Sequence, residues 1–189
     1  MEWTVKSIIA CINFLRFFPH LCLAKLMGGV INEDVKVNCR HKTLKYSSIC
    51  YGLLYLLTFD KLFRVLFYYR LGRLKYLVMW LAPPHNSFII ATSSKIGKGM
   101  LCVHPIGTVV NARTVGEHFI VGNNTVIGAN INGVPEIGDE VFVGVNCVII
   151  GNIKIGNNVK IGAGSVVVKD VPSNCTIVGN PARIIKKMN

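Results

Sequence analysis

The chain has 189 residues, seven cysteines and a formal net charge of +12 at pH 7. This length suits one domain, or one domain with a helical appendage, and is enough to bury a real core. The odd number of cysteines and the lack of any Cys-x-x-Cys pair argue against a disulfide scaffold and against a zinc site, and favour reduced thiols in the cytosol.

The positive charge is concentrated in the first half of the chain. Residues 1–95 contain 13 of the 21 Lys and Arg and four of the nine acidic residues, a net charge of +9, whereas residues 96–189 carry +3. Nothing in this half matches a nucleic-acid-binding module with base-stacking aromatic residues on a basic sheet, so we expect no nucleic-acid partner.

Residues 1–88 are expected to form a basic helical region. Apolar segments over residues 5–31 and 46–59 are interrupted by charges or too short to cross a bilayer. Asp60 is a candidate N-cap for a long helix over residues 61–81, which must end before Pro83. Basic residues lie on opposite arcs of that helix, so it is either wedged between protein surfaces or resting on something acidic. The region is an oligomerisation cap for the second half or, alternatively, a peripheral attachment to anionic lipid at the inner membrane surface.

The second half of the chain repeats every six residues. Ile or Val recurs at positions 137, 143, 149, 155, 161 and 167, and Gly often follows. Helices repeat every 3.6 residues and strands every two, so a period of six is typical of a solenoid in which each unit is a short strand and a corner. Three units close one triangular coil, and the coils stack about 4.8 Å apart in parallel β pairing. We predict a parallel β-helix over residues 89–171, with about four coils from residue 96, and a C-terminal tail over residues 172–189.

Two irregularities interrupt the repeat. The step from Cys102 to Val109 is seven residues, and this corner contains His104, which can act as a general base when the coils on either side hold it in place. Four extra residues before Ile137 predict a protruding loop that either shapes the choice of acceptor or is a tolerated insertion. His118 and the Asn and Asp pairs at other corners are expected to be turn residues.

Three motifs carry a resemblance to a known family. His104-Pro-Ile-Gly-Thr-Val-Val110, Ile161-Gly-Ala-Gly-Ser-Val-Val167 and Gly179-Asn-Pro-Ala-Arg183 resemble the serine acetyltransferase branch of the hexapeptide-repeat acyltransferases, whose fold is a left-handed β-helix. The resemblance covers about residues 90–187, and the helical start with Tyr69-Arg-Leu-Gly72 is most similar to the short acetyltransferases of capsule, exopolysaccharide and O-antigen clusters. It implies a cytoplasmic homotrimer, acetyl-CoA held between neighbouring subunits, and direct transfer of the acetyl group to a hydroxyl.

The resemblance also assigns roles to individual residues. His104 matches the family's general base, and no metal is implied. The matching cofactor-binding positions are Gly128 and Ala129 for the thioester oxygen, Gly144, Val145, Gly162 and Ala163 for the pantetheine arm, and Arg183 and Lys186, together with Lys187, for the phosphates of CoA.

Two positions depart from the serine acetyltransferase pattern. The aspartate that partners the family's base falls at Ile89, and a second histidine that recognises the amino acid falls at Val134. We therefore expect a sugar hydroxyl of polysaccharide biosynthesis as acceptor, with serine O-acetylation as the alternative. The alternative of another class is a non-catalytic β-helix scaffold. A hexapeptide-repeat carbonic anhydrase is disfavoured because only His104 and His118 lie within the repeat and no two histidines are closely spaced.

Overall fold

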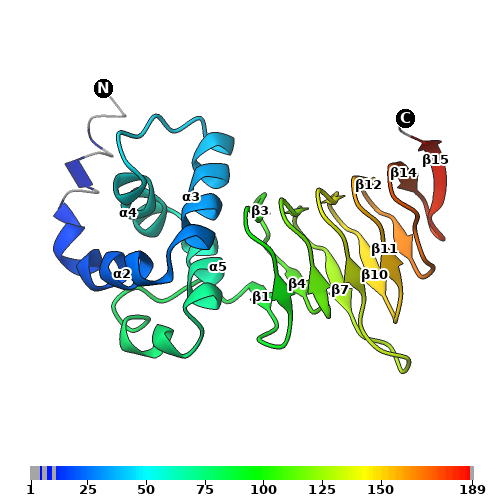
Figure 1. The fold of residues 1–189 in the computed structure, drawn as a ribbon, viewed down its shortest axis with the longest axis horizontal. Coiled ribbons are helices and arrows are strands. Elements are labelled where there is room, and N and C mark those ends of the chain that lie inside the picture. The colour runs from blue at the N-terminus through cyan, green and yellow to red at the C-terminus, as the bar shows by residue number, and fades with distance from the viewer. Residues whose placement is uncertain (1–4, 6–7, 10–11, 188–189) are drawn as a thin grey trace. The chain divides into compact units, whose positions relative to one another are not determined.

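The computed structural model describes residues 5, 8–9 and 12–187, and the chain divides into two compact units, Met1–His85 and Asn86–Asn189. The first unit is helical (Figure 1). It consists of α2 (Phe14–Met27), α3 (Gly29–His41), α4 (Ile49–Phe59), α5 (Lys61–Leu71) and the 3-10 helix η1 (Gly72–Leu77). Among the described residues no single helix has the length and apolar character of a membrane span, although α2 and α3, bent by 117°, reach it together as a pair.

Local capping signals set the ends of these helices. Asp60 accepts hydrogen bonds from the backbone N–H groups of Leu62 (3.0 Å) and Phe63 (2.9 Å), so the predicted N-cap is confirmed. The predicted single helix over residues 61–81 is wrong, because α5 ends at Leu71. Gly72, with φ 55° and ψ −124°, takes a backbone conformation that few residues other than glycine adopt, and a short 3-10 segment follows.

Two arginines of α5 are buried, so this helix is wedged between protein segments. Arg64 is 4% exposed and donates to the carbonyl oxygens of Leu57 (2.6 Å) and Pro83 (3.1 Å). The guanidinium of Arg70 forms a buried ion pair with Asp34 of α3, with 2.8 Å between Nε and Oδ2. Removing one partner of such a pair typically costs about 3–5 kcal/mol, because the other charge is left buried. Part of the positive charge of this unit is therefore structural.

His20 is fully buried, and its surroundings favour the neutral imidazole, which carries a proton on one ring nitrogen only. Its Nε2 lies 2.9 Å from the hydroxyl of Tyr68, which itself donates to the carbonyl oxygen of Ala82 at 2.7 Å. Nε2 must therefore donate, and Nδ1 is a bare acceptor with no hydrogen-bond partner among the described residues. Burial, together with the positive charges of Arg64 and Arg16, lowers the pKa of His20 to about 4, and the backbone of Val78 opposes this shift only in part.

We expect the helical unit to lose stability as the pH falls from about 6.5 towards 4. In this pH window His20 takes up a proton in the unfolded chain but not in the folded unit, so a fall in pH favours unfolding. The loss approaches about 3 kcal/mol, since one pKa unit corresponds to about 1.4 kcal/mol. Thermal unfolding of the wild type and of His20→Phe between pH 7 and pH 4 measures it. The variant should lose less stability than the wild type over this range, and an equal loss would contradict the assignment.

The second unit is a parallel β-helix, as the six-residue period predicts (Figure 1). One face is β1 (Phe88–Ile90), β4 (Thr108–Val110), β7 (Val126–Gly128), β10 (Val148–Ile150) and β13 (Val166–Val167). The second face is β2 (Lys95–Ile96), β5 (Thr114–Val115), β8 (Glu136–Ile137) and β11 (Lys154–Ile155). The third face is β3 (Leu101–Cys102), β6 (Ile120–Val121), β9 (Phe142–Val143), β12 (Val159–Ile161) and β14 (Cys175–Val178), with the antiparallel strand β15 (Arg183–Lys187) at its end.

The solenoid is longer than the sequence predicted. It has about five turns, because β1 precedes the four coils counted from residue 96 and β14 continues the third face into the predicted tail of residues 172–189. The residues at the six-residue positions from Ile137 to Val167 are all buried, as expected of an aliphatic interior. Asn124, Glu140 and Asn158 have positive φ at the corners, which confirms their expected role as turn residues.

A column of small buried residues supports the corner between the third face and the first face. We call it corner C/A, where C stands for the third face and A for the first. Its members are Thr108, Thr125, Cys147 and Ser165, none of them exposed. Each side chain donates to a carbonyl oxygen at this corner. The Thr125 hydroxyl, for example, lies 2.9 Å from the carbonyl oxygen of Gly144 and accepts a hydrogen bond from the N–H of Cys147 at 3.3 Å. This column holds successive turns in register at the corner that also contains His104.

Candidate functional site

The irregular corner contains two residues more than the corners stacked on it. Cys102 pairs with Val121, and Val110 pairs with Ile127, so this turn uses eight residues where the next uses six. The predicted step of seven, ending at Val109, is therefore wrong by one. Val110 is the fully buried residue, while Val109 is only partly buried. Because the strands on both sides stay in register, the extra residues are displaced outward at corner C/A.

His104 lies on this insertion and is exposed to solvent. Its backbone has φ 47°, a left-handed conformation that is uncommon outside glycine and asparagine. Hydrogen bonds fix the segment on both sides. The N–H of Val103 donates to the carbonyl oxygen of Val121 at 3.0 Å, and the N–H of Gly107 donates to that of Ser87 at 2.8 Å. The imidazole is thus presented to solvent from a backbone that neighbouring turns hold in place.

No side-chain hydrogen bond orients the His104 imidazole within the described part of the chain. Ile89, where the family's pattern has an aspartate, pairs with Val109 in β1 and is 53% exposed. The other position that departs from the pattern, Val134, lies partly buried in the loop between β7 and β8. At both positions the chain therefore has an apolar side chain in place of the family's polar one.

The structure brings some of the predicted cofactor residues to the corner of His104 and leaves others apart from it. Gly144, Val145, Gly162 and Ala163 lie at corner C/A, on turns stacked beyond the turn of His104. Gly128, the last residue of β7, and Ala129 lie at the corner between the first and second faces, on the turn stacked next to that of His104. Arg183 and Lys186 are exposed on β15 at the C-terminal end of the solenoid. One chain alone therefore does not gather all of these residues into one cleft.

Two of these glycines are needed for stacking. A Cβ atom at Gly144 would lie 2.8 Å from the backbone nitrogen of Ala163, and one at Gly162 would lie 2.6 Å from Cγ1 of Val178. At Gly128 the nearest atom would be 3.9 Å away, so this position has room for a side chain. The close approach of the turns explains Gly144 and Gly162 without any ligand.

We expect Gly144→Ala to lower the free energy of unfolding by about 1–3 kcal/mol, because the added methyl must push two turns apart. The matched variant Gly128→Ala should change it by less than about 0.5 kcal/mol. Denaturant unfolding of both variants measures the difference. Equal free energies of unfolding for Gly144→Ala and Gly128→Ala would mean that the stacked turns move apart at a lower cost than the contact distances indicate.

The loop between β7 and β8 protrudes from the solenoid, as predicted (Figure 1). It closes on itself, because the N–H of Asn130 donates to the carbonyl oxygen of Gly133 at 3.0 Å and the side chain of Asn130 accepts from the N–H of Asn132 at 2.8 Å. Ile131 at its tip is fully exposed. A fully exposed isoleucine at the tip of a closed loop is available for contact with a substrate or another copy.

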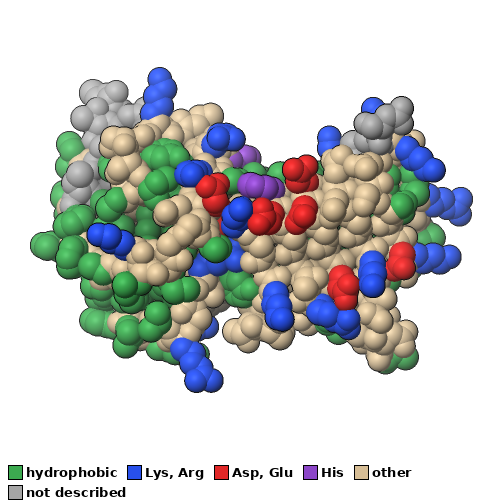
Figure 2. Space-filling view, in the orientation of Figure 1, with side chains coloured by type: hydrophobic (Ala, Val, Ile, Leu, Met, Phe, Trp, Pro, Cys, Tyr) green, Lys and Arg blue, Asp and Glu red, His purple; other side chains and the backbone are tan. Residues whose placement is uncertain are grey.

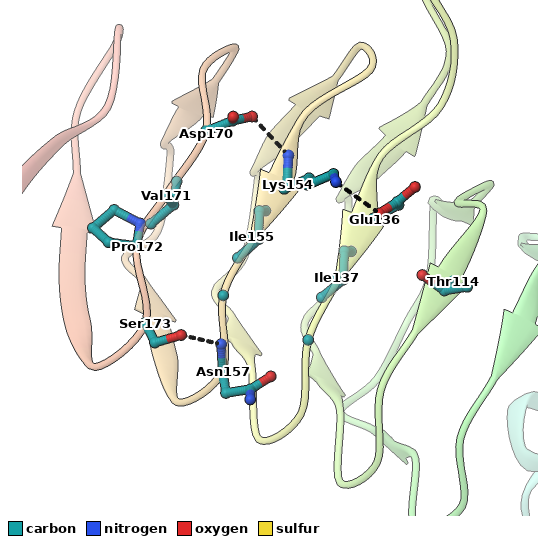
Figure 3. A pocket seen from close by; sticks show the side chains of 12 residues that line it. Thr114, Glu136, Ile137, Lys154, Ile155, Asn157, Asp170, Val171, Pro172 and Ser173 are labelled. Atoms are coloured by element: carbon teal, nitrogen blue, oxygen red, sulfur yellow. Dashed lines mark hydrogen bonds and ion pairs between the residues drawn. The ribbon is translucent and has the colours of Figure 1, made fainter.

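Sequence analysis missed a groove on the second face of the solenoid (Figure 3). It has a volume of about 670 Å³ and is lined by the strands β8 and β11 and by residues 170–173. Glu136 and Lys154 face each other there, with 3.9 Å between their charged atoms, and Asp170 accepts from the N–H of Lys154 at 2.8 Å. The signal was present as charged residues directly before the inward aliphatic residues Ile137 and Ile155. The groove does not include His104, and its mixed charge suits a polar partner.

Other catalytic chemistry finds little support. The described residues contain no group of three or more His, Cys, Asp or Glu side chains that could hold a metal ion. Burial raises the pKa of the Cys147 thiol, which is the opposite of what a nucleophilic cysteine needs. Among the histidines of the solenoid, His118 is also exposed with φ 54° but lies at a regular corner, whereas His104 lies on the insertion.

The solenoid is similar in sequence to known hexapeptide-repeat transferases. Residues 135–169 match the family described as bacterial transferase hexapeptide (six repeats). The chain is 41% identical over 106 residues to a serine acetyltransferase of Synechococcus elongatus, covering 51% of this chain and 41% of the relative. It is 45% identical over 102 residues to the mitochondrial serine acetyltransferase 3 of Arabidopsis thaliana, covering 49% of this chain and 25% of the relative. The chain thus spans less than half the length of these curated relatives.

The fold is similar over most of the chain. The crystal structure of serine acetyltransferase from Neisseria gonorrhoeae in complex with serine has a TM-score of 0.69 and 28% identity, and the match covers 90% of this chain and 73% of that one. The chain is therefore similar in fold, and in part of its sequence, to serine acetyltransferases, with a left-handed hexapeptide-repeat β-helix that follows a helical region in the chain. The expected closeness to capsule-cluster acetyltransferases is not supported, because these similar proteins are serine acetyltransferases.

Proposed function

We propose that the protein is an O-acetyltransferase that uses acetyl-CoA as acyl donor and His104 as general base. The observation that carries the proposal is the anchored, outward-facing insertion that exposes His104 at one edge of a solenoid similar to serine acetyltransferases. A base fixed in this way can take the proton of a hydroxyl as that oxygen attacks the thioester carbonyl, an effect typically worth a factor of about 10² to 10⁴. The carbon–sulfur bond then breaks, and CoA leaves as the thiol after taking up a proton.

The remaining groups of the proposed site come from more than one copy of the chain. The backbone N–H of Ala129 is suited to stabilise the negative oxygen of the tetrahedral intermediate, but Ala129 and His104 lie at different corners of one solenoid. A homotrimer whose corners face each other would bring these groups together and enclose acetyl-CoA between neighbours. The exposed Arg183 and Lys186 would then attract the phosphates of CoA.

Serine is the acceptor we favour, because the similar proteins are named as serine acetyltransferases and one of them was crystallised with serine. The sugar hydroxyl expected from the sequence is the second candidate. Ile89 and Val134 favour it, since neither residue can pair with a charged end of an amino acid or orient the base. The two candidates share the donor and the base, and they differ in what binds beside His104.

Replacing His104 tests the base. His104→Asn keeps a residue that tolerates the left-handed backbone but removes the basic nitrogen, so turnover of acetyl-CoA should fall at least about a hundredfold while the fold persists. His118→Asn is the matched control, because His118 is also an exposed corner residue with positive φ, and it should keep wild-type turnover. Release of free CoA measures both. Equal turnover by the wild type and His104→Asn would contradict the role of His104 as base, and no turnover by either would leave the scaffold alternative.

A panel of acceptors tests the choice of substrate. Release of CoA from acetyl-CoA is measured with L-serine and with nucleotide-linked and lipid-linked sugars. We expect the highest kcat/KM with serine. Turnover with a sugar but not with serine would select the second candidate, and no turnover with any hydroxyl would refute the transferase.

A further inference from the structure

We propose that the helical unit binds the surface of a membrane rich in anionic lipid through an apolar face formed by α2 and the segment from η1 to Trp80. This inference is independent of the acetyl transfer proposed above. It rests on exposed apolar side chains, the lack of acidic residues near them, and an apolar depression beside them.

The outer side of α2 carries a stripe of apolar residues that no other described part of the unit covers. Leu15 is 84% exposed and Leu26 is 79% exposed, while Phe17, His20 and Ala24 on the opposite side are buried. Phe18 and Cys22 lie between the two leucines on the exposed side, at the spacing of one helix face. Leucines are normally the buried residues of an amphipathic helix. This helix therefore has two apolar faces, of which one packs against the rest of the unit and the other is exposed.

The segment after α5 adds a second group of exposed apolar and aromatic residues. Tyr76, Leu77 and Trp80 are 66%, 64% and 74% exposed. The two groups belong to one region of the unit, because Arg16 of α2 donates to the carbonyl oxygen of Leu81 at 2.7 Å. Figure 2 shows hydrophobic side chains gathered over much of one side of the helical unit. Trp and Tyr are enriched where a protein meets the headgroup region of a bilayer.

A depression between α2 and α4 opens beside the stripe. It has a volume of about 390 Å³, and its lining includes Phe14, Phe18, Ile49 and Leu53, with Lys25 as its charged residue. An apolar depression with a cation beside it suits part of an acyl chain whose headgroup is anionic.

The charges around this face indicate which class of partner it binds. Residues 12–32 contain Arg16 and Lys25 and no acidic residue, and Arg73 and Lys75 flank the aromatic group. A second copy of the same face would bring like charges together, which disfavours self-association. Anionic lipid matches both the apolar and the basic character, since Lys and Arg near such a surface are attracted to its negative charge.

Co-sedimentation with vesicles tests the proposal. The full chain should bind vesicles containing about one-third phosphatidylglycerol and not vesicles of phosphatidylcholine alone, and added salt should weaken the binding. Leu15→Glu/Leu26→Glu should lower the partition coefficient at least about tenfold. Ile185→Glu is the matched control, because Ile185 is 63% exposed on the other unit and its replacement should leave binding unchanged.

Tryptophan emission gives a second readout of the same surface. In a Trp3→Phe background Trp80 is the single tryptophan, and its emission should shift to the blue on anionic vesicles only. Circular dichroism and CoA release check that the variants are folded. Absence of binding to anionic vesicles, or equal binding of the double variant, would overturn the proposal. Dissociation of an assembly by the double variant, with no vesicle binding by the wild type, would instead identify an interface between copies.

Discussion

The stacking of turns in register is the constraint on which the rest of the β-helix depends. Each turn satisfies its backbone hydrogen bonds on the turns before and after it, and the buried column from Thr108 to Ser165 satisfies carbonyl oxygens at corner C/A. The close contacts at Gly144 and Gly162 leave no space between turns for additional atoms. An insertion therefore cannot be absorbed inside the prism, and its residues must leave at a corner.

This constraint explains where the chemistry can lie. The two extra residues before Val110 expose His104, and the four before Ile137 form the protruding loop. The regular turns contribute mainly small residues and backbone groups to the corners, which suit a long thin ligand better than a compact one. Since the insertion and the N–H of Ala129 lie at different corners, the acyl-transfer site that we propose requires a neighbouring copy.

Much of this fold could be predicted from the sequence. The aliphatic positions from Ile137 to Val167 set the period, and the Asn residues of the corners take the left-handed backbone that their side chains tolerate. The length of the insertion at His104 could not be counted, because Val109 and Val110 are both aliphatic and only strand pairing shows which one is buried. The groove on the second face was missed because its charged residues are ordinary exposed positions when read one repeat at a time.

The helical region was harder to predict, since its contacts are not periodic. Gly72 ends α5 through its backbone conformation, and Arg64 is buried because it reaches carbonyl oxygens far along the chain. The acceptor expected from the sequence followed from two single positions, whereas the similarity of the solenoid as a whole favours serine. Single positions such as Ile89 and Val134 show where this chain differs from the serine acetyltransferase pattern, and they do not by themselves identify a substrate.

Titration of the protein with CoA, followed by the NMR signals of the histidine side chains, tests the central claim most directly. If the insertion holds His104 beside the sulfur of bound CoA, the imidazole resonances of His104 shift and saturate with CoA while those of His118 stay unchanged. Binding of CoA that shifts backbone signals of the solenoid but leaves the His104 imidazole unperturbed would contradict the account.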